Sequence, residues 1–448
     1  MRLFGTDGVR GVANKDLTAE LAYNLGKAGA HVLSHEKEQP LIIIGRDTRI
    51  SGDMLEDALS AGILSMGGNV IKAGVLPTPA VAWLVKHVNA DAGVVISASH
   101  NPYEYNGIKF FNKHGFKLDD GLEDEIEDVI NGAVDVSSHI HSERLGRRCI
   151  DNKNYAEAYI NFLISVLDQD IGGMYVVLDC ANGASFEIAP KVFHELGVRV
   201  SVIGDKPDGL NINNGFGSTH PEKLLHTVLN LGADLGLAFD GDADRVIAVD
   251  EKGNIVNGDT ILYILAKQLT RKQSQWNKMV TATVMSNIGL TKALGKIGCS
   301  IQITDVGDRY VIERMLETGS LIGGEQSGHV IMLDHTTTGD GILTGMLLAG
   351  AIRSFGQKLS ELAAEVRVYP QILKNAAVAN DKKHRFREDD VIMNEIARIE
   401  QLMAGEGRIL IRPSGTEPLV RVMIEGSDPD MITEMATGLA DLIVSRCG

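Results

Sequence analysis

The chain has 448 residues, of which 44% are hydrophobic and 23% are charged, and its formal net charge is −16 at pH 7. This length is several times that of a typical domain and predicts about three or four compact units. The acidic balance argues against nucleic-acid and membrane-surface partners, because both favour basic patches. No apolar run reaches the roughly 18 residues of a membrane span, and the first residues lack the apolar centre of a secretory signal. We therefore expect a soluble protein with no membrane partner and no nucleic-acid partner.

The cysteines give a second indication of where the protein works. There are four, and none forms a CxxC pair: Cys149, Cys180, Cys299 and Cys447. Scattered cysteines without pairing motifs predict reduced thiols and a cytoplasmic location.

Three stretches repeat one pattern of an apolar strand, a polar turn, a helix closed by glycine and a second strand. They begin at LIIIGRDTRIS (41–51), MYVVLDCANG (174–183) and KMVTATVMSN (278–287). Gly67 with Gly68, Gly197 and Gly298 stand where helices end in a left-handed residue. Strands that alternate with helices predict parallel sheets, so we expect three related α/β domains in series. The alternative is that these common units recur by chance.

The C-terminal part follows a different pattern. A polar run, NDKKHRFREDD, precedes a helical segment, VIMNEIARIEQLMAG. Two strands around a polar turn, RILIRPSGTEPLVRVMIEG, and a last amphipathic segment, MITEMATGLADLIVS, complete a small α+β domain. The predicted domains are 1–152, 153–253, 254–367 and 368–448.

Two serines, Ser97 and Ser99, follow the apolar segment AGVVI at 92–96. Ligand sites of open α/β sheets lie at the carboxyl ends of strands. A serine there can be a nucleophile, a phosphate acceptor or a helix N-cap. His100 is a poor candidate for its base, since neighbours in an extended chain point to opposite sides.

Three aspartates, Asp240, Asp242 and Asp244, alternate with small residues after the apolar strand LGLAF. In a tight loop their carboxylates can converge on one hard cation such as Mg²⁺. An EF-hand does not fit, because Arg245 occupies its sixth position and a strand, VIAV, continues where that loop must turn. The remaining alternative is a solvated acidic turn.

RPSGTEP at 412–418 has the composition of an anion cradle. Arg412 offers a planar fork for phosphate, Ser414 and Thr416 offer hydroxyls, and Gly415 allows backbone N–H groups to approach closely. Arg421 on the next strand could add a second fork. The alternative is an ordinary hairpin turn.

GGEQSGHV at 323–330 places Glu325, Ser327 and His329 on one face if the segment is extended. A carboxylate, a hydroxyl and an imidazole side by side suit the hydroxyls or the amine of a sugar. Further cations follow predicted strands or begin loops: Arg10, Arg46, Arg49, Lys109, Arg245 and Arg309. For each one alone the alternative is an ordinary surface charge, but their recurrence in so acidic a chain indicates a cleft that attracts phosphate.

Six motifs, in order along the whole chain, give the sequence a strong resemblance to the α-D-phosphohexomutase family. They are FGTDGVRG, ISASHNP with NGIKFF, DGDADR, VGDRYV, GEQSGH and RPSGTEP. The resemblance implies three related α/β domains and a smaller fourth around a central active-site cleft, in agreement with the repeats. The variants SASHNP, GEQSGH and RPSGTEP resemble those of the bacterial members that act on glucosamine phosphates.

The resemblance also implies roles for individual residues. Ser99 is then the phosphoserine, and Asp240, Asp242 and Asp244 hold one Mg²⁺ that also touches the Ser99 phosphate. Glu325 and Ser327 bind sugar hydroxyls. The distal phosphate is held by Arg412, Ser414, Gly415, Thr416 and Arg421. The centre is lined by Arg10, Lys109, Arg245 and His329, among which Lys109 and His329 are candidates for proton transfer or charge stabilisation.

The implied reaction interconverts glucosamine 6-phosphate and glucosamine 1-phosphate through glucosamine 1,6-bisphosphate, as an isomerase supplying cell-wall amino-sugar precursors. The implied partners are the phosphosugar, a second copy of the chain in a homodimer, and a kinase or self-transfer step that first phosphorylates Ser99. The alternatives are a phosphoglucomutase or phosphomannomutase of the same family, a Mg²⁺-dependent sugar phosphatase, and a non-catalytic sugar-phosphate sensor.

Overall fold

The computed structural model describes residues 2–5, 7–34, 37–136, 142–149, 154–273, 275–403, 405–414 and 417–448. The chain divides into two compact units, which are treated separately below. The first unit comprises Met1–Thr283 and Ile301–Ala364, and the second comprises Val284–Ser300 and Glu365–Gly448.

The first sheet of unit 1 has the strand order β1-β5-β4-β2-β3. Its strands are β1 (Val9–Val12), β2 (Leu41–Arg46), β3 (Asn69–Val75), β4 (Ala92–Ile96) and β5 (Tyr105–Asn112). β2 runs parallel to β3 and β4, whereas β5 is antiparallel to both β4 and β1. The predicted parallel pairing is therefore confirmed for β2, β3 and β4 but not for β5 and β1, because the short link between β4 and β5 cannot make the crossover that a parallel pair needs.

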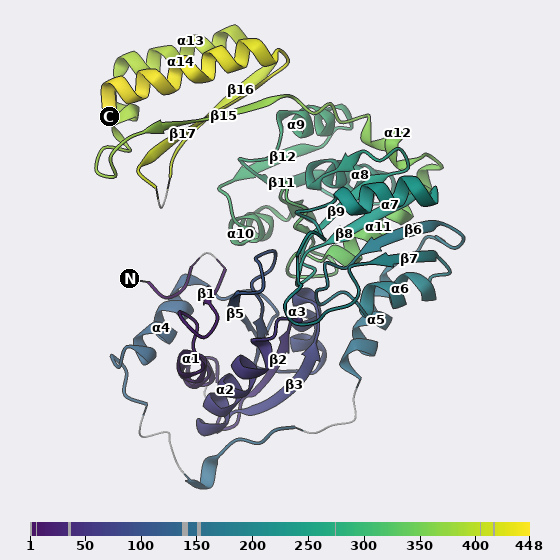
Figure 1. The fold of residues 1–448 in the computed structure, drawn as a ribbon, viewed down its shortest axis with the longest axis vertical. Coiled ribbons are helices and arrows are strands. Elements are labelled where there is room, and N and C mark those ends of the chain that lie inside the picture. Colours follow the sequence, from purple (N-terminus) through teal and green to yellow (C-terminus); the bar gives the residue numbers. More distant parts are fainter. Residues whose placement is uncertain are drawn as a thin grey trace. The chain divides into compact units, whose positions relative to one another are not determined.

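The helices of this region are α1 (Ala19–Val32), α2 (Gly52–Ser65), α3 (Thr78–His87) and α4 (Asp120–Ile130), and a short η2 (Ser142–Arg144) follows. α1 packs against α2 and α4, and α3 packs on β2 and β4 (Figure 1). α1 and α2 approach closely because a side chain on Gly26 would meet the Leu59 carbonyl oxygen, and one on Gly62 would meet that of Tyr23. Only glycine permits this contact, which completes the core beneath the sheet.

The second and third sheets repeat this mixture of parallel and antiparallel strands. The second has the order β10-β9-β8-β6-β7 and the third β12-β11-β13-β14. Their strands are β6 (Tyr175–Asp179), β7 (Arg199–Ile203), β8 (Leu235–Phe239), β9 (Val246–Asp250), β10 (Ile255–Val256), β11 (Met279–Thr283), β12 (Ser300–Thr304), β13 (Ile322–Gly324) and β14 (Val330–Met332). Their helices within unit 1 are α5 (Tyr155–Val166), α6 (Ile188–Glu195), α7 (Glu222–Leu231), α8 (Gly258–Lys272), α10 (Asp308–Thr318), α11 (Gly341–Phe355) and α12 (Leu359–Ala363).

The predicted repeats and their helix ends are confirmed. Gly67, Gly197 and Gly298 all have positive φ directly after a helix of the repeat. Polar side chains cap the N-termini of other helices in unit 1 by accepting a backbone N–H: Thr18 at α1, Asp119 at α4, Asn154 at α5, Asn257 at α8 and Asp340 at α11.

Unit 2 contains α9 (Ile288–Lys296) and the predicted α+β domain. An antiparallel sheet has the order β15-β17-β16, with β15 (Gln371–Ala377), β16 (Gly407–Pro413) and β17 (Leu419–Gly426). η3 (Arg385–Glu388), α13 (Asp390–Met403) and α14 (Pro429–Cys447) complete it, and both long helices lie over one face of the sheet (Figure 1). Ile392, Ile399, Val422 and Leu439 are among the side chains that fill the core between them.

No helix in the part of the chain that the structure describes is both long and apolar enough to cross a membrane.

Candidate active site

Ser99 is a buried residue of the loop directly after β4. Its backbone φ is +52°, a left-handed conformation that is unusual for a residue with a side chain. The Ser99 N–H donates to the Ser97 hydroxyl at 3.0 Å, and that hydroxyl donates to Asp47 at 2.6 Å. The described residues between β4 and β5 form turns and no helix, so neither serine is a helix N-cap.

The three aspartates gather in the loop after β8. They lie in the same unit as Ser99, and one ligand oxygen from each of Asp240, Asp242 and Asp244 lies within 4.8 Å of the other two. The Ser99 Oγ donates to Asp240 Oδ2 at 2.5 Å, so the serine and the aspartate cluster form one site. All three aspartates are at least 97% buried, at 0%, 0% and 3% exposure, which excludes a solvated acidic turn.

The charge of this cluster is only partly balanced by the protein. Asp242 Oδ1 and Asp244 Oδ1 are buried and have no hydrogen-bond partner among the residues that the structure describes. Burial, with the charges of Asp244 and Asp242, holds the pKa of Asp240 well above its ordinary value. Orphaned carboxylate oxygens of this kind fit a hard divalent cation, which prefers oxygen ligands.

A network of alternating charges surrounds the aspartates, and we call it the cleft charge network: Asp242, Lys109, Asp7, Lys117 and Asp308. Lys109 Nζ lies 2.9 Å from Asp242 and 3.0 Å from Asp7. Lys117 Nζ bridges Asp7, at 2.5 Å, and Asp308. Burial opposes the charge on Lys109, but Asp242 and Asp7 outweigh it and raise its pKa. Both lysines therefore act as fixed cations.

His329 is 1% exposed and stands between two carboxylates. Its Nδ1 lies 3.5 Å from Asp244 and its Nε2 lies 3.7 Å from Asp308. Burial opposes a charge on the ring, while Asp244 and then Asp308 raise its pKa. The Gly339 N–H nevertheless donates to Nε2 at 3.0 Å, which requires a free lone pair there. This hydrogen bond assigns the neutral ring with its proton at Nδ1, and a cation that offset Asp244 would favour the same form.

Arg245 and His100 flank the serine on another side. The Arg245 N–H donates to Asp240 Oδ1 at 3.2 Å, and its guanidinium lies 3.4 Å from His100 Nδ1. His100 Nδ1 also lies 3.4 Å from the Ser99 Oγ. The expectation that His100 points away is wrong, because Ser99 is left-handed rather than extended. Burial, with Arg245 and Arg10, lowers the pKa of His100, so the ring is neutral.

Other predicted cations have separate positions. Arg10, on β1, pairs with Asp7 of the cleft charge network. Arg46 pairs with Asp53 at 2.5 Å. Arg309 pairs with Asp120 at 2.6 Å, within a cluster outside the cleft charge network. Of these three arginines, Arg10 is the one that pairs with a member of the cleft charge network.

The segment after β13 is turned, not extended as expected. The Gly328 N–H donates to the Glu325 carbonyl oxygen at 3.0 Å, and Gly328 has a φ of +93°. The Glu325 carboxylate accepts the Gly307 N–H at 3.2 Å, and its charge helps to raise the pKa of Arg245. Ser327 is exposed, whereas His329 is buried, so the three side chains do not share one face.

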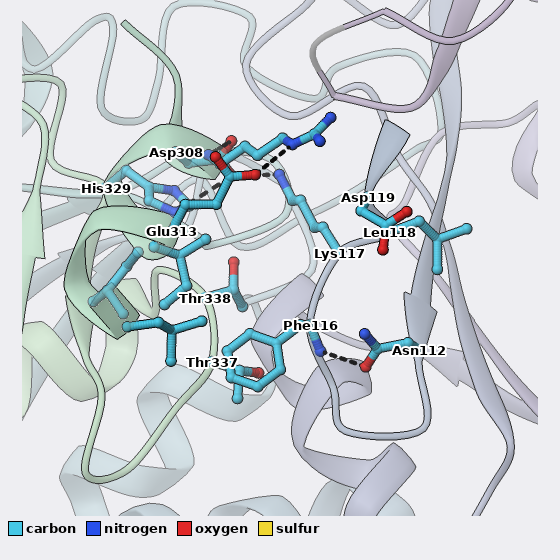
Figure 2. A pocket seen from close by; sticks show the side chains of 14 residues that line it. Asn112, Phe116, Lys117, Leu118, Asp119, Asp308, Glu313, His329, Thr337 and Thr338 are labelled. Atoms are coloured by element: carbon cyan, nitrogen blue, oxygen red, sulfur yellow. Dashed lines mark hydrogen bonds and ion pairs between the residues drawn. The ribbon is translucent and has the colours of Figure 1, made fainter. Parts of the chain in front are cut away.

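A cavity of about 240 Å³ lies beside Lys117, Asp308 and His329. Figure 2 shows the Lys117 ammonium reaching the Asp308 carboxylate, with His329 on the far side of that carboxylate. Phe116 and Ile331 contribute apolar wall. The cleft charge network therefore borders an open space within unit 1.

The predicted phosphate loop belongs to unit 2. Arg412 on β16 stands directly opposite Arg421 on β17. Arg421 pairs with Glu417 at 3.0 Å, whereas Arg412 has no carboxylate partner among the described residues. The buried Ser414 accepts the Glu417 N–H at its hydroxyl. Gly415 and Thr416 lie outside the described residues.

Several residues of the site were not singled out from the sequence. Thr78 donates to Asp242 at 2.6 Å, and Asp7, Lys117 and Asp308 complete the cleft charge network. Asp7 and Asp308 lie inside the quoted motifs FGTDGVRG and VGDRYV, which could have suggested them. No pattern in the sequence marked Thr78 or Lys117.

Comparisons with known proteins agree with this architecture. Family models described as phosphoglucomutase/phosphomannomutase match as alpha/beta/alpha domain I at 1–135, domain II at 153–253, domain III at 257–369 and the C-terminal domain at 373–442. A phosphoglucosamine mutase of Acetivibrio thermocellus is 55% identical over 100% of both chains. One from a Thermoanaerobacter species is 56% identical over 99% of this chain and 98% of its own.

Solved structures share the fold. A phosphoglucomutase/phosphomannomutase family protein of Burkholderia thailandensis has a TM-score of 0.84 at 23% identity, covering 99% of this chain and 97% of its own. An N-acetylphosphoglucosamine mutase of Aspergillus fumigatus, in complex with GlcNAc-6P and magnesium, has a TM-score of 0.67 at 17% identity, covering 100% and 96%. With the four domain matches and full-length relatives above half identity, the chain belongs to the phosphoglucomutase/phosphomannomutase family and is an isomerase of the mutase type.

Proposed function

We propose that this mutase interconverts glucosamine 6-phosphate and glucosamine 1-phosphate through a phosphorylated Ser99 and glucosamine 1,6-bisphosphate. The observation that carries the proposal is the 2.5 Å hydrogen bond from Ser99 Oγ to Asp240, one of three clustered carboxylates. The full-length relatives named phosphoglucosamine mutase support the choice of sugar.

Each half-reaction moves one phosphoryl group. In the first, the bond between phosphorus and Ser99 Oγ breaks while a free sugar hydroxyl oxygen bonds to phosphorus. That hydroxyl loses its proton and Ser99 Oγ gains one. The bisphosphate then turns end for end, and the second half-reaction returns its other phosphoryl group to Ser99. Such transfers need in-line positioning and charge neutralisation more than covalent chemistry from the protein.

Two cations near the aspartate cluster, the buried Lys109 and the half-buried Arg245, suit that neutralisation. Lys109 and Arg245 keep their charges because neighbouring carboxylates raise both pKa values, even though burial opposes the charges. Their roles are to stabilise phosphate oxygens, with Arg10 beside them through Asp7. His329, with its proton at Nδ1, is the residue proposed to hold and move a proton.

Asp240, Asp242 and Asp244, with Ser99, are proposed to hold one Mg²⁺. Their fit rests on the orphaned oxygens of Asp242 and Asp244. Magnesium is also present in the Aspergillus fumigatus relative. When bound, the cation supplies positive charge to the transferring phosphoryl group.

Substrate recognition is assigned to two segments. Glu325 and Ser327 are proposed to bind sugar hydroxyls. Arg412 and Arg421 are proposed to hold the distal phosphate, because two guanidinium groups opposite each other in a strand pair favour a bound anion. The proposed phosphate site also includes Ser414, Gly415 and Thr416.

Further parts of the proposal concern the setting of the enzyme. They are a homodimer, first phosphorylation of Ser99 by a kinase or by self-transfer, a supply of cell-wall amino-sugar precursors, and a cytoplasmic location. The four free cysteines accord with a reducing compartment. The proposed domain divisions remain 1–152, 153–253, 254–367 and 368–448.

A panel of sugar phosphates tests the reaction. The protein is incubated with Mg²⁺, a trace of the matching 1,6-bisphosphate, and the 6-phosphate of glucosamine, glucose or mannose, and phosphorus NMR follows the products. The proposal expects glucosamine 1-phosphate to form fastest. Faster turnover of glucose or mannose phosphate would reassign the sugar, and release of inorganic phosphate without isomer would indicate a phosphatase.

A further inference from the structure

The loop that carries Ser99 accepts hydrogen bonds from side chains outside the loop. The carbonyl oxygens of Ser99 and Asn101 each accept two hydrogen bonds. Arg49 Nη2 donates to them at 2.9 Å and 2.9 Å. Asn213 Nδ2 donates to the same two oxygens at 2.8 Å and 3.0 Å. We call this pair of donors the carbonyl clamp.

Arg49 is committed entirely to the protein. It is 1% exposed, and its Nε pairs with Asp47 at 2.8 Å. Its Nη1 donates to the carbonyl oxygens of Tyr105, at 3.0 Å, and Pro102. The sequence-based view of Arg49 as a cation that attracts phosphate is therefore wrong, since none of its nitrogens remains for a ligand.

Asn213 reaches the serine loop from the loop between β7 and α7, within the second sheet's region. It is 6% exposed, and its own N–H donates to the Ala181 carbonyl oxygen at 2.8 Å. Its φ is +60°, a conformation that asparagine tolerates better than most residues. The amide group is thus held in place by contacts that do not involve Ser99.

The opposite side of the Ser99 peptide is held as well. Its N–H donates to the Ser97 hydroxyl, which donates to the same Asp47 that pairs with Arg49. Hydrogen bonds on both sides therefore maintain the left-handed Ser99 backbone, an unfavourable conformation that persists only where its surroundings fix it.

We propose that Arg49 and Asn213 are positioning residues that fix Ser99 Oγ for both half-reactions; this inference rests on the proposed function of Ser99. The same oxygen must release phosphorus in one half-reaction and attack it in the other. Both steps need in-line geometry, so a displaced loop would slow both. The donors of the clamp are used on backbone carbonyl oxygens, so we expect substrate binding not to depend on them.

Two variants of Asn213 test the clamp. Asn213→Gly removes the donor without straining the left-handed backbone. Asn213→Asp keeps the size but sets a carboxylate against two carbonyl oxygens. We expect kcat to fall at least about 10-fold in the glycine variant and further in the aspartate variant, while KM for glucosamine 6-phosphate stays within about twofold.

Asn89→Gly is the matched control, because Asn89 is exposed and also has a φ of +60°. It should retain wild-type turnover. Thermal unfolding of each variant checks the fold. A kcat for Asn213→Asp equal to that of the wild type would overturn the inference, because it would mean that only the size of the side chain matters. A rise in KM as large as the fall in kcat in the Asn213 variants would also overturn it.

A single-turnover measurement separates this inference from the proposed function. Purified phospho-enzyme is mixed with glucosamine 6-phosphate and quenched, and mass spectrometry follows the phosphate on Ser99. Slower loss of that phosphate in the Asn213 variants supports the clamp. Normal transfer from Ser99 in both wild type and variants overturns the clamp alone. If the wild type carries no transferable phosphate on Ser99, the proposed function fails and the clamp fails with it.

Discussion

Charge is clustered in two regions of the molecule, the cleft charge network around Asp242 and the strand pair that carries Arg412 and Arg421. In the network, Lys109 lies within 3.0 Å of two carboxylates, and every member is paired. On the strand pair, Arg412 faces another arginine, although Arg408 on the same strand faces Glu425 and pairs with it at 2.8 Å. In the cleft charge network, ion pairs fix the positions of the charged side chains. On the strand pair, the Arg412 guanidinium remains available to bind an anion. Substitutions should therefore affect position and stability in the first and substrate binding in the second.

The largest expected effect comes from Ser99→Ala, which removes the proposed phosphoryl carrier beside the aspartate cluster. We expect turnover to fall on the order of 10⁴-fold or more, because no other group can take its place. Phosphorus NMR of glucosamine 6-phosphate conversion measures this. Ser165→Ala, at an exposed hydroxyl of α5, is the control. Substantial residual turnover in Ser99→Ala would remove the serine from its role.

Lys117→Met tests whether the cleft charge network holds the fold. The substitution leaves the largely buried Asp308 carboxylate without its lysine, whereas Asp7 keeps Lys109 and Arg10. Stability should therefore fall by about 3 kcal/mol. The midpoint of thermal unfolding measures the loss. Adding Asp308→Asn should restore part of it, and Lys252→Met, at an exposed lysine, should change little. An unchanged midpoint in Lys117→Met would mean that the network contributes no stability.

Asp242→Asn weakens the proposed cation site. Since Asp242 Oδ1 is one of the orphaned oxygens, we expect the Mg²⁺ concentration for half-maximal activity to rise by at least about 100-fold. A magnesium titration of turnover measures this, with Asp234→Asn at an exposed carboxylate as the control. An identical titration curve for Asp242→Asn would count against the aspartate cluster as the metal site.

The smallest of these effects is expected for Arg412→Ala, on the strand pair that carries Arg412 and Arg421. Loss of charged hydrogen bonds to a phosphate should raise KM by about 10-fold or somewhat more, with a smaller change in kcat. Thermal stability should stay unchanged. Arg412 has no carboxylate partner among the described residues, so its removal leaves none of them with an unpaired carboxylate. Steady-state kinetics measure KM and kcat, and Arg398→Ala, at an exposed arginine of α13, is the control. An unaltered KM would show that the distal phosphate is bound elsewhere.

The sequence allowed the strands, helices and the serine and aspartate loops to be predicted because each depends on neighbours along the chain. Ser99 and the aspartates follow apolar strands, and open α/β sheets bind ligands at such strand ends. Lys117 and Asn213 could not be predicted in this way. Their partners lie more than 100 positions away, so their roles depend on how the sheets pack rather than on any local pattern.

Local backbone geometry explains the remaining errors. The left-handed Ser99 brings His100 within 3.4 Å of its hydroxyl, where an extended chain would not. The turn at Gly328 separates Ser327 from His329. Both departures arise from positive φ at single residues, which alternation along the sequence does not reveal.

The hydrogen bond from Ser99 to Asp240 joins segments 141 positions apart. During synthesis on the ribosome, the first sheet emerges complete before that carboxylate exists. A product terminated between the two sheets would carry the reactive hydroxyl yet lack its acceptor. The proposed phosphoryl transfer at Ser99 therefore requires the second sheet to have folded.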